Sequence, residues 1–140
     1  MKATAVAVSN IVGTQGKAAE VIAALAATGR VAAGDLGLLT EAAIRLEREG
    51  GPAVKETIAA FAEMGKEPTK GALKLNESTR FLTVSLYEQI KALEDQGKTA
   101  EAARVAQEAY AKTTIQRTKE LEGQLGTLST AWRKVQEAAK

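Results

Sequence analysis

The sequence has no cysteine and no histidine among its 140 residues, and only one tryptophan, two tyrosines and two phenylalanines. Without cysteine there is no disulfide framework, thiolate-bound zinc or thiol redox chemistry. Without histidine, His-based catalytic triads and His-ligated metal sites are excluded. A binding cleft lined by aromatic side chains is also hard to build from so few of them. The sequence therefore predicts a protein that is not an enzyme, with no catalytic residues, no cofactor and no metal site.

An excess of charge of either sign is also missing. Nineteen basic and 17 acidic residues give a net charge of +2. Sequence-independent binding to nucleic acid depends on a basic arm or face, which this composition does not provide. We therefore expect no nucleic-acid specificity, and we expect the mixed charges to cover solvated helix faces.

Long apolar runs are missing as well. The most apolar region, residues 3–33, is interrupted by polar side chains before it reaches the roughly 18 residues of a membrane span. The run Ala3–Val8 is shorter than the apolar core of a typical signal peptide. Residues 1–13 contain several β-branched residues and favour no single structure. We therefore predict an N-terminal segment of uncertain structure and no transmembrane span.

What the sequence does contain is a repeated helical pattern. Apolar residues recur at spacings of three and four, which predicts an all-α fold of several short helices followed by one long amphipathic helix. Residues 14–140 are predicted to form a single helical domain, either a helical bundle or a partly extended one. The predicted helices cover about 16–28, 36–49, 52–64, 68–75, 83–96 and 99–139.

Residues with known positional preferences mark the predicted helix ends. Asp35 and Thr83 are placed as N-caps, and Pro52 is placed in the first turn of a helix, where proline is tolerated. Residues 76–81 read as a polar break. Three glycines are placed as helix stops, namely Gly29, Gly50 and Gly97.

The long C-terminal helix has two apolar stripes that do not share one register. The later stripe has heptad-like spacing over about two heptads, which suggests a coiled coil without proving one. Gly123 and Gly126 each cost about 1 kcal/mol inside a helix and mark either a bend or the close approach of another helix. The earlier stripe consists of Ala103, Ala106, Tyr110 and Thr114, with Ile115 slightly off it, and the later one of Leu121, Leu125, Leu128, Trp132 and Val135.

Alanine dominates the apolar residues, so each helix has a thin apolar stripe that buries little surface. At about 25 cal/mol per Å² of buried apolar area, such stripes stabilise weakly. We therefore expect marginal stability of the monomer, or self-association that adds stability.

Two arrangements resemble reactive sites but lack required parts. Gly13–Ala18 is similar to a phosphate-binding loop, yet position 11 is isoleucine and position 18 is alanine where the loop needs glycine and a hydroxyl residue. Neighbouring carboxylates point to different faces of their helices, so no pair forms an obvious catalytic dyad. These pairs are Glu47 and Glu49, Glu94 and Asp95, and Glu120 and Glu122.

Four segments together resemble the tail length tape measure proteins of long, flexible-tailed phages of the lambda type. They are LKLNE (73–77), FLT (81–83), YEQIKALEDQGKTAEAARVAQEAYA (87–111) and LGTLSTAW (125–132). These are packing and capping residues, and their specificity lies in their order and spacing. The resemblance covers about residues 14–140 and is strongest after residue 72.

The resemblance implies a structural component of a phage tail. It implies a mostly helical protein that lies in the lumen of the tail and sets its length while the tube assembles in the cytoplasm of the bacterial host. The implied partners are the tail tube protein and tail assembly chaperones. With 140 residues the chain is far shorter than a whole tape measure, so we interpret it as a fragment or a prophage-derived domain. The alternatives are a helical interaction module that docks a partner through its C-terminal helix and, third, an enzyme with a pocket of convergent polar groups.

Overall fold

The structure is a computed structural model that describes the backbone of residues 15–138 and the side chains of residues 16–123. Over this backbone the chain is all-α, as predicted, and has no strand. None of the helices in this part combines the length and apolar character needed to cross a membrane. The helices are α2 (Gln15–Ala27), α3 (Leu36–Arg48), α4 (Val54–Lys66), α5 (Pro68–Thr79), α6 (Val84–Asp95) and α7 (Thr99–Ala138), and the short 3-10 helix η1 (Ala33–Asp35) precedes α3.

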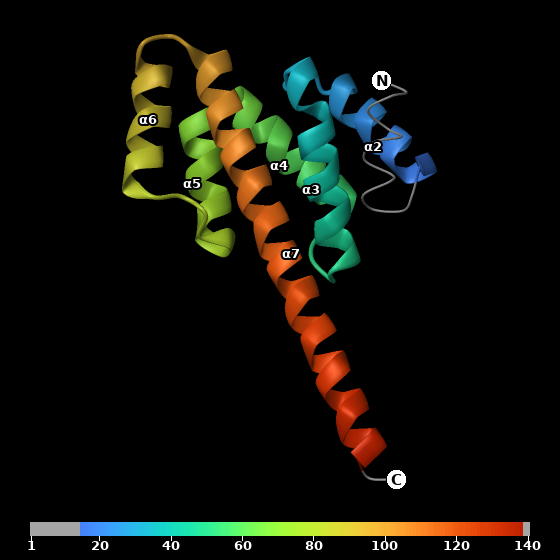
Figure 1. The fold of residues 1–140 in the computed structure, drawn as a ribbon. Helices are drawn as coiled ribbons and strands as arrows, with labels where there is room; N and C mark the ends of the chain where they lie inside the picture. Colours follow the sequence, from blue (N-terminus) through green and yellow to red (C-terminus); the bar gives the residue numbers. More distant parts are fainter. Residues whose placement is uncertain (1–14, 139–140) are drawn as a thin grey trace.

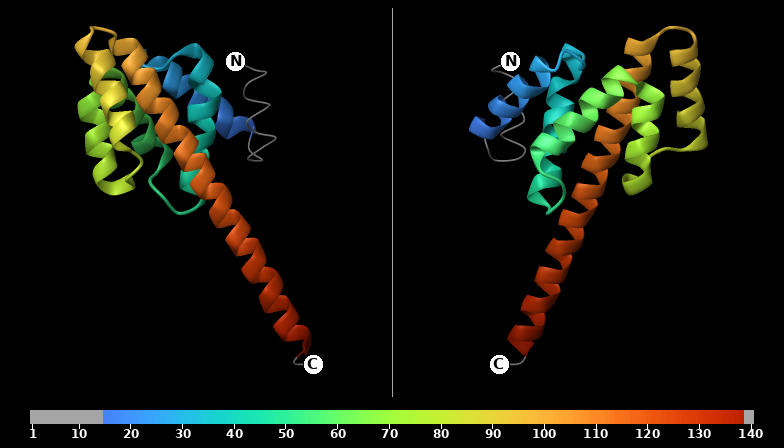
Figure 2. Two further views of the ribbon diagram at one scale, coloured as in Figure 1. Left: turned by 60° about the vertical axis from the view of Figure 1, so that its left-hand side comes forward. Right: turned by 180° about the vertical axis from the view of Figure 1, so that it is seen from behind.

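The long helix α7 organises the fold. It packs against α3, α4, α5 and α6, while α2 packs against α3 and α4. Figure 1 shows the shorter helices gathered around the first part of α7, whose remaining part extends away from them. The same arrangement is seen from two other sides in Figure 2. We call residues 15–122 the head, so the fold combines a helical bundle with one projecting helix.

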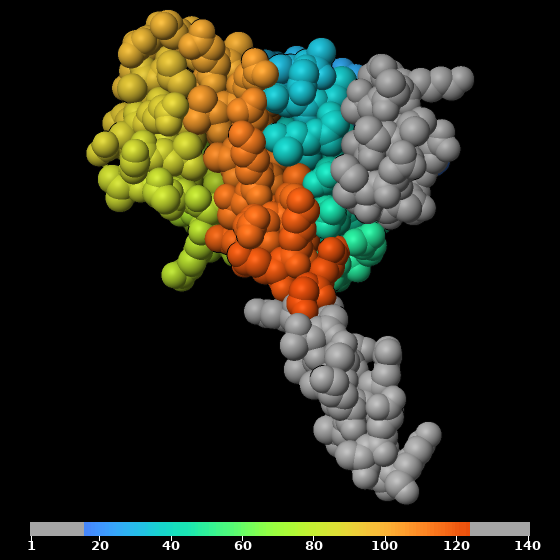
Figure 3. All heavy atoms as spheres, viewed as in Figure 1, coloured from blue at the N-terminus to red at the C-terminus, as the bar shows by residue number. Residues whose placement is uncertain are grey.

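The first part of α7 lies in the middle of the head. In Figure 3 its orange atoms fill the space between the α3 side and the α5–α6 side. Below this surface, the ring of Tyr110 meets two phenylalanine rings edge-on, with centroids 5.6 Å from Phe61 and 5.3 Å from Phe81. Such edge-to-face pairs each contribute about 0.5–1.5 kcal/mol beyond the area that they bury. Three of the five aromatic residues of the chain therefore meet where α4, the α5–α6 connection and α7 come together.

Four of the six predicted helices agree with the structure to within one residue, which is the usual uncertainty of helix ends. The predicted stops are confirmed, because Gly29, Gly50 and Gly97 have φ values of 66°, 85° and 80°. Thr83 is confirmed as a cap, since its Oγ1 accepts a hydrogen bond of 3.1 Å from the Leu86 N–H.

Two predicted helices had wrong boundaries. The helix predicted at 52–64 begins at Val54, because Ala53 is extended and Pro52 lies outside the helix, and it ends at Lys66. The helix predicted at 68–75 continues to Thr79, so the predicted break at 76–81 is shorter. The hydroxyl of Thr79 donates a hydrogen bond of 2.8 Å to the Leu75 carbonyl, so this polar side chain bonds to the helix instead of interrupting it.

Candidate functional site: the seating of the long helix

The most developed feature of the described side chains is the row of contacts that seats α7 in the head. Its apolar part is the stripe predicted from the sequence. All five of its residues are buried, which confirms the prediction: Ala103, Ala106, Tyr110, Thr114 and Ile115. Burial raises the pKa of the Tyr110 hydroxyl. Tyr110 is therefore a core residue.

Gln107 is the polar centre of this row and is 1% exposed. Its Nε2 donates hydrogen bonds of 3.0 Å to the carbonyl of Arg30 and 2.8 Å to the carbonyl of Phe61. One amide group thereby joins α7 to the α2–α3 connection and to α4. Gly65 makes this approach possible, because a Cβ built there would lie 2.5 Å from Arg30 Cβ and 3.2 Å from Gln107 Nε2.

One turn earlier on α7, Arg104 lies between two carboxylates. Its Nε is 3.2 Å from Asp35 Oδ2 and 3.0 Å from Glu108 Oε1. Burial, followed by the hydrogen bond and charge of Glu108, raises the pKa of Asp35, while the hydrogen bond from Asp35 lowers the pKa of Glu108. Asp35 occupies the N-cap position of α3, as predicted, but its side chain makes no capping hydrogen bond to that helix. Its carboxylate instead binds a cation that is distant in the sequence.

Arg117 attaches α7 to the end of α5. Its guanidinium donates hydrogen bonds of 2.5 Å to the Thr79 carbonyl and 3.0 Å to the Arg80 carbonyl. These carbonyls lie at the C-terminus of α5, where a cation interacts favourably with the helix dipole. Arg80 adopts the left-handed conformation there, with a φ of 50°.

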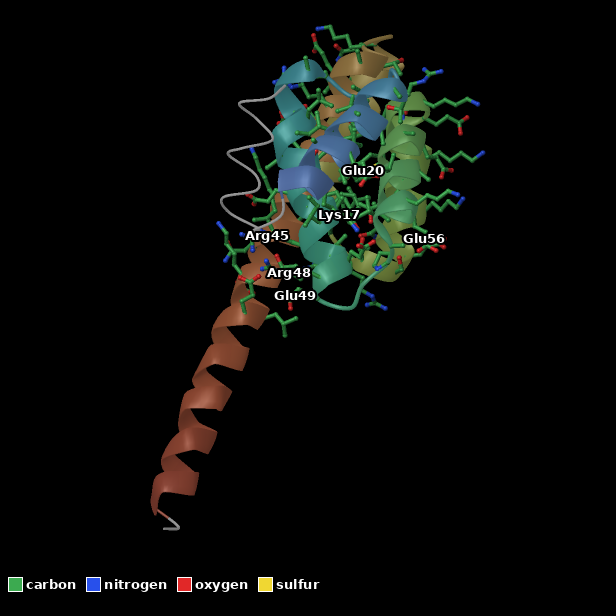
Figure 4. The ribbon with its side chains drawn as sticks, turned by 90° about the vertical axis from the view of Figure 1, so that its right-hand side faces the viewer. Lys17, Glu20, Arg45, Arg48, Glu49 and Glu56 are labelled. Atoms are coloured by element: carbon green, nitrogen blue, oxygen red, sulfur yellow. The ribbon has the colours of Figure 1, made fainter. Side chains whose placement is uncertain are left out.

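The last of these contacts is a clasp where α7 leaves the head, formed by Glu122 with Arg45 and Arg48 of α3. Arg45 Nη1 lies 3.2 Å and 3.4 Å from the two carboxylate oxygens of Glu122, and Arg48 Nη2 also bonds to this carboxylate. Arg45 is only 4% exposed, and Figure 4 labels both arginines beside the exit of α7. The hydrogen bond from Arg48 and the charges of both arginines lower the pKa of Glu122.

Two further carboxylates cap helices other than their own. Glu47 of α3 accepts a 2.8 Å hydrogen bond from the Val54 N–H at the start of α4, and its other oxygen binds Lys17 Nζ at 2.5 Å. Glu94 of α6 accepts a 3.2 Å hydrogen bond from the Thr69 N–H at the start of α5. Neither α4 nor α5 has a capping side chain of its own. One N–H group at each start is therefore satisfied by a carboxylate of a neighbouring helix.

The head also has open hollows. One, of about 440 Å³, lies between the α2–α3 connection, the end of α4 and the start of α7, and its lining includes Arg30, Arg104 and Gln107. Another, of about 390 Å³, lies between α2 and α4 and is lined mainly by apolar residues with Lys17, Glu20 and Lys55. Among the described side chains, no group of three or more acidic residues is arranged to hold a metal ion.

The sequence missed most of the polar contacts of α7. Gln107 had a usable signal, because it lies four residues after Ala103 and three before Tyr110, on the buried stripe itself. The partners of Arg104, Asp35 of η1 and Glu108 of its own helix, were not predicted. The later apolar stripe lies outside the described side chains except for Leu121, which is 39% exposed, and so the coiled coil stays a prediction. The N-terminal segment, residues 1–13, also lies outside the described residues.

Comparison with known proteins gives one consistent result. A family model described as prophage tail length tape measure protein matches residues 1–91. The chain is also similar to the tape measure protein of Pseudomonas phage PAJU2, with 31% identity over 124 residues. That match covers 89% of this chain and 14% of the relative, so the chain spans about one seventh of the length of this relative. No solved structure matches.

Proposed function

Since the chain belongs to the family of prophage tail length tape measure proteins, we propose that it is a structural, non-enzymatic segment of a longer protein that sets the length of a phage tail. The observation that carries this proposal is α7, a continuous helix of 40 residues. At 1.5 Å per residue such a helix spans about 60 Å. The proposed location is the virion tail, with assembly in the cytoplasm of the bacterial host. The proposed partners are the tail tube protein and tail assembly chaperones.

The fold makes the proposal quantitative. If residues 14–140 were one extended helix, they would account for roughly 190 Å of tail. In the folded head, however, α3 to α6 lie beside α7 and α2 packs on α3 and α4, so these helices are not joined end to end with α7 (Figure 2). The segment then contributes about the length of α7, so that most of its residues provide packing and do not add to length.

The test is a pair of insertions in the parent phage. A helical insert of 28 residues after Ser129 lengthens α7 by about 42 Å, and tails should lengthen by a similar mean amount in electron micrographs. The same insert between Pro52 and Ala53, in the exposed α3–α4 connection, is the matched control and should leave tail length unchanged. Equal lengthening by both inserts would mean that the head is not folded in the tail.

Unchanged tails with both inserts would overturn the proposed role in length. The result would then favour the alternative, a helical interaction module that docks a partner through its C-terminal helix. The observation that motivates this alternative is the projection of α7 beyond the head (Figure 1). Loss of viability with only the Ser129 insert, at normal tail length, would be its expected signature.

A further inference from the structure

The place where α7 leaves the head is sharply defined. Glu122 is held by Arg45 and Arg48, and Arg45 is 4% exposed. Arg45 also pairs with Glu41 of α3 at 3.4 Å, so movement of Glu122 would remove one of two carboxylates beside a buried cation, which is unfavourable. Through these two arginines Glu122 joins α7 to α3. Beyond it, the ribbon of α7 runs past the ends of the other helices (Figure 2). The clasp therefore separates a seated part of the helix from a projecting part.

The residue immediately after the clasp is Gly123, and Gly126 follows one turn later. The structure explains other glycines of the head. Gly65 and Gly71 allow close approaches, and Gly97 has a positive φ. Neither reason applies at Gly123, which lies within α7 and where an added Cβ would meet nothing within 4 Å. What remains is the intrinsic effect of glycine, which weakens the interior of a helix.

We propose that Gly123 and Gly126 form a hinge in α7, located directly after the Glu122 clasp. The clasp holds the helix rigidly on one side, and the two glycines lower the cost of bending on the other. Sharp bends in helices commonly occur at glycine. The head and the projecting helix then change their relative direction while both stay helical. The hinge is a property of the purified chain and does not depend on the proposed role in tail length.

A distance measurement between two spin labels tests this hinge. Since the chain has no cysteine, labels are introduced by Lys112→Cys and Lys134→Cys, 22 residues apart across the glycines, or about 33 Å in a straight helix. The control pair, Lys98→Cys with Lys119→Cys, has a similar separation but lies wholly before the clasp. For the first pair we expect a broad distribution of label-to-label distances with a mean below about 33 Å. For the control pair we expect a narrow distribution of these distances near about 32 Å.

The combined variant Gly123→Ala/Gly126→Ala should narrow the distribution of the first pair to the width of the control. A first pair that is already as narrow as the control in the unmodified protein overturns the hinge. A broad distribution that the two alanines leave unchanged also overturns it.

Hydrogen exchange distinguishes a hinge from simple fraying of the helix end. For a hinge, amides at 123–127 exchange faster than those at 128–135, and the two alanines slow exchange at 123–127 by about 25-fold. For fraying, protection falls steadily towards residue 138 with no local minimum. A steady fall would overturn the proposal.

Discussion

Replacing Gly65 by alanine should destabilise the head, although alanine is the better helix former. The change gains about 1 kcal/mol in helix propensity. The new Cβ, however, would lie 2.5 Å from Arg30 Cβ and 2.6 Å from the Arg30 carbonyl oxygen. Both atoms belong to or adjoin the backbone, so relief requires the α2–α3 connection to move away from α4.

This movement has two costs. Overpacking in a well-packed region costs about 1–3 kcal/mol. Displacing the Arg30 carbonyl also weakens its 3.0 Å hydrogen bond from Gln107, which removes a further 0.5–1.5 kcal/mol or so. After the gain in propensity, the free energy of unfolding should fall by about 2 kcal/mol. The midpoint of thermal unfolding should fall by roughly 5–10 °C.

Gly16→Ala is the matched control, because Gly16 also lies in a helix but has nothing within 4 Å of an added Cβ. The free energy of unfolding of both variants is measured by urea denaturation, monitored by circular dichroism. We expect opposite signs, with Gly16→Ala neutral or stabilising by up to about 1 kcal/mol. If Gly65→Ala were as stable as the unmodified protein, the close approach of Arg30 to α4 would be refuted.

Two other perturbations follow from the helix ends. The hydrogen bonds from Lys17 and the Val54 N–H lower the pKa of Glu47 below its ordinary 4.5, so the contribution of Glu47 to stability is present above that pH and is lost as the pH falls through the lowered pKa. Glu47→Gln should therefore reduce the loss of stability at acid pH, measured as the free energy of unfolding against pH. An unchanged loss at acid pH would contradict this cap. Arg80→Gly should raise the free energy of unfolding by up to about 1 kcal/mol, because Arg80 has a φ of 50°. The carbonyl of residue 80 would still accept its hydrogen bond from Arg117. A variant that is less stable in thermal unfolding would show that the arginine side chain has a structural role.

The part of the fold that depends on local preferences could be predicted from the sequence. Gly29, Gly50 and Gly97 end helices because glycine accepts positive φ more easily than other residues. One boundary, the start of α4, was wrong because a tertiary contact stabilises the start of this helix. The start of α4 is stabilised by Glu47, which is seven residues away from Val54 and on another helix. Such a cap has no short-range signature.

The polar part of the candidate site could not be predicted, because its pairs are far apart in the sequence. Asp35 and Arg104 are 69 residues apart, and Arg45 and Glu122 are 77 apart. A carboxylate and a guanidinium on helix surfaces have many possible partners, and local spacing favours those on the same helix. Arg104 does pair with Glu108 on its own helix, but its other partner is Asp35, which is buried next to α7 and could not be identified from local spacing.

The sequence by itself determined that this protein is helical, where most of its helices end, and which stripe of α7 is apolar, because these properties depend on φ preferences and on spacings within one turn. Its order of packing and capping residues also carried the resemblance to tape measure proteins. Only the tertiary structure decided that α7 lies in the middle of the head, that Gln107 joins three segments, and that the clasp of Glu122 with Arg45 and Arg48 forms where α7 leaves the head. These features depend on which helix faces meet in space. Thin alanine-rich stripes are compatible with many such pairings. Buried polar groups such as Gln107 and Arg45 select among them, because each requires specific hydrogen-bond partners.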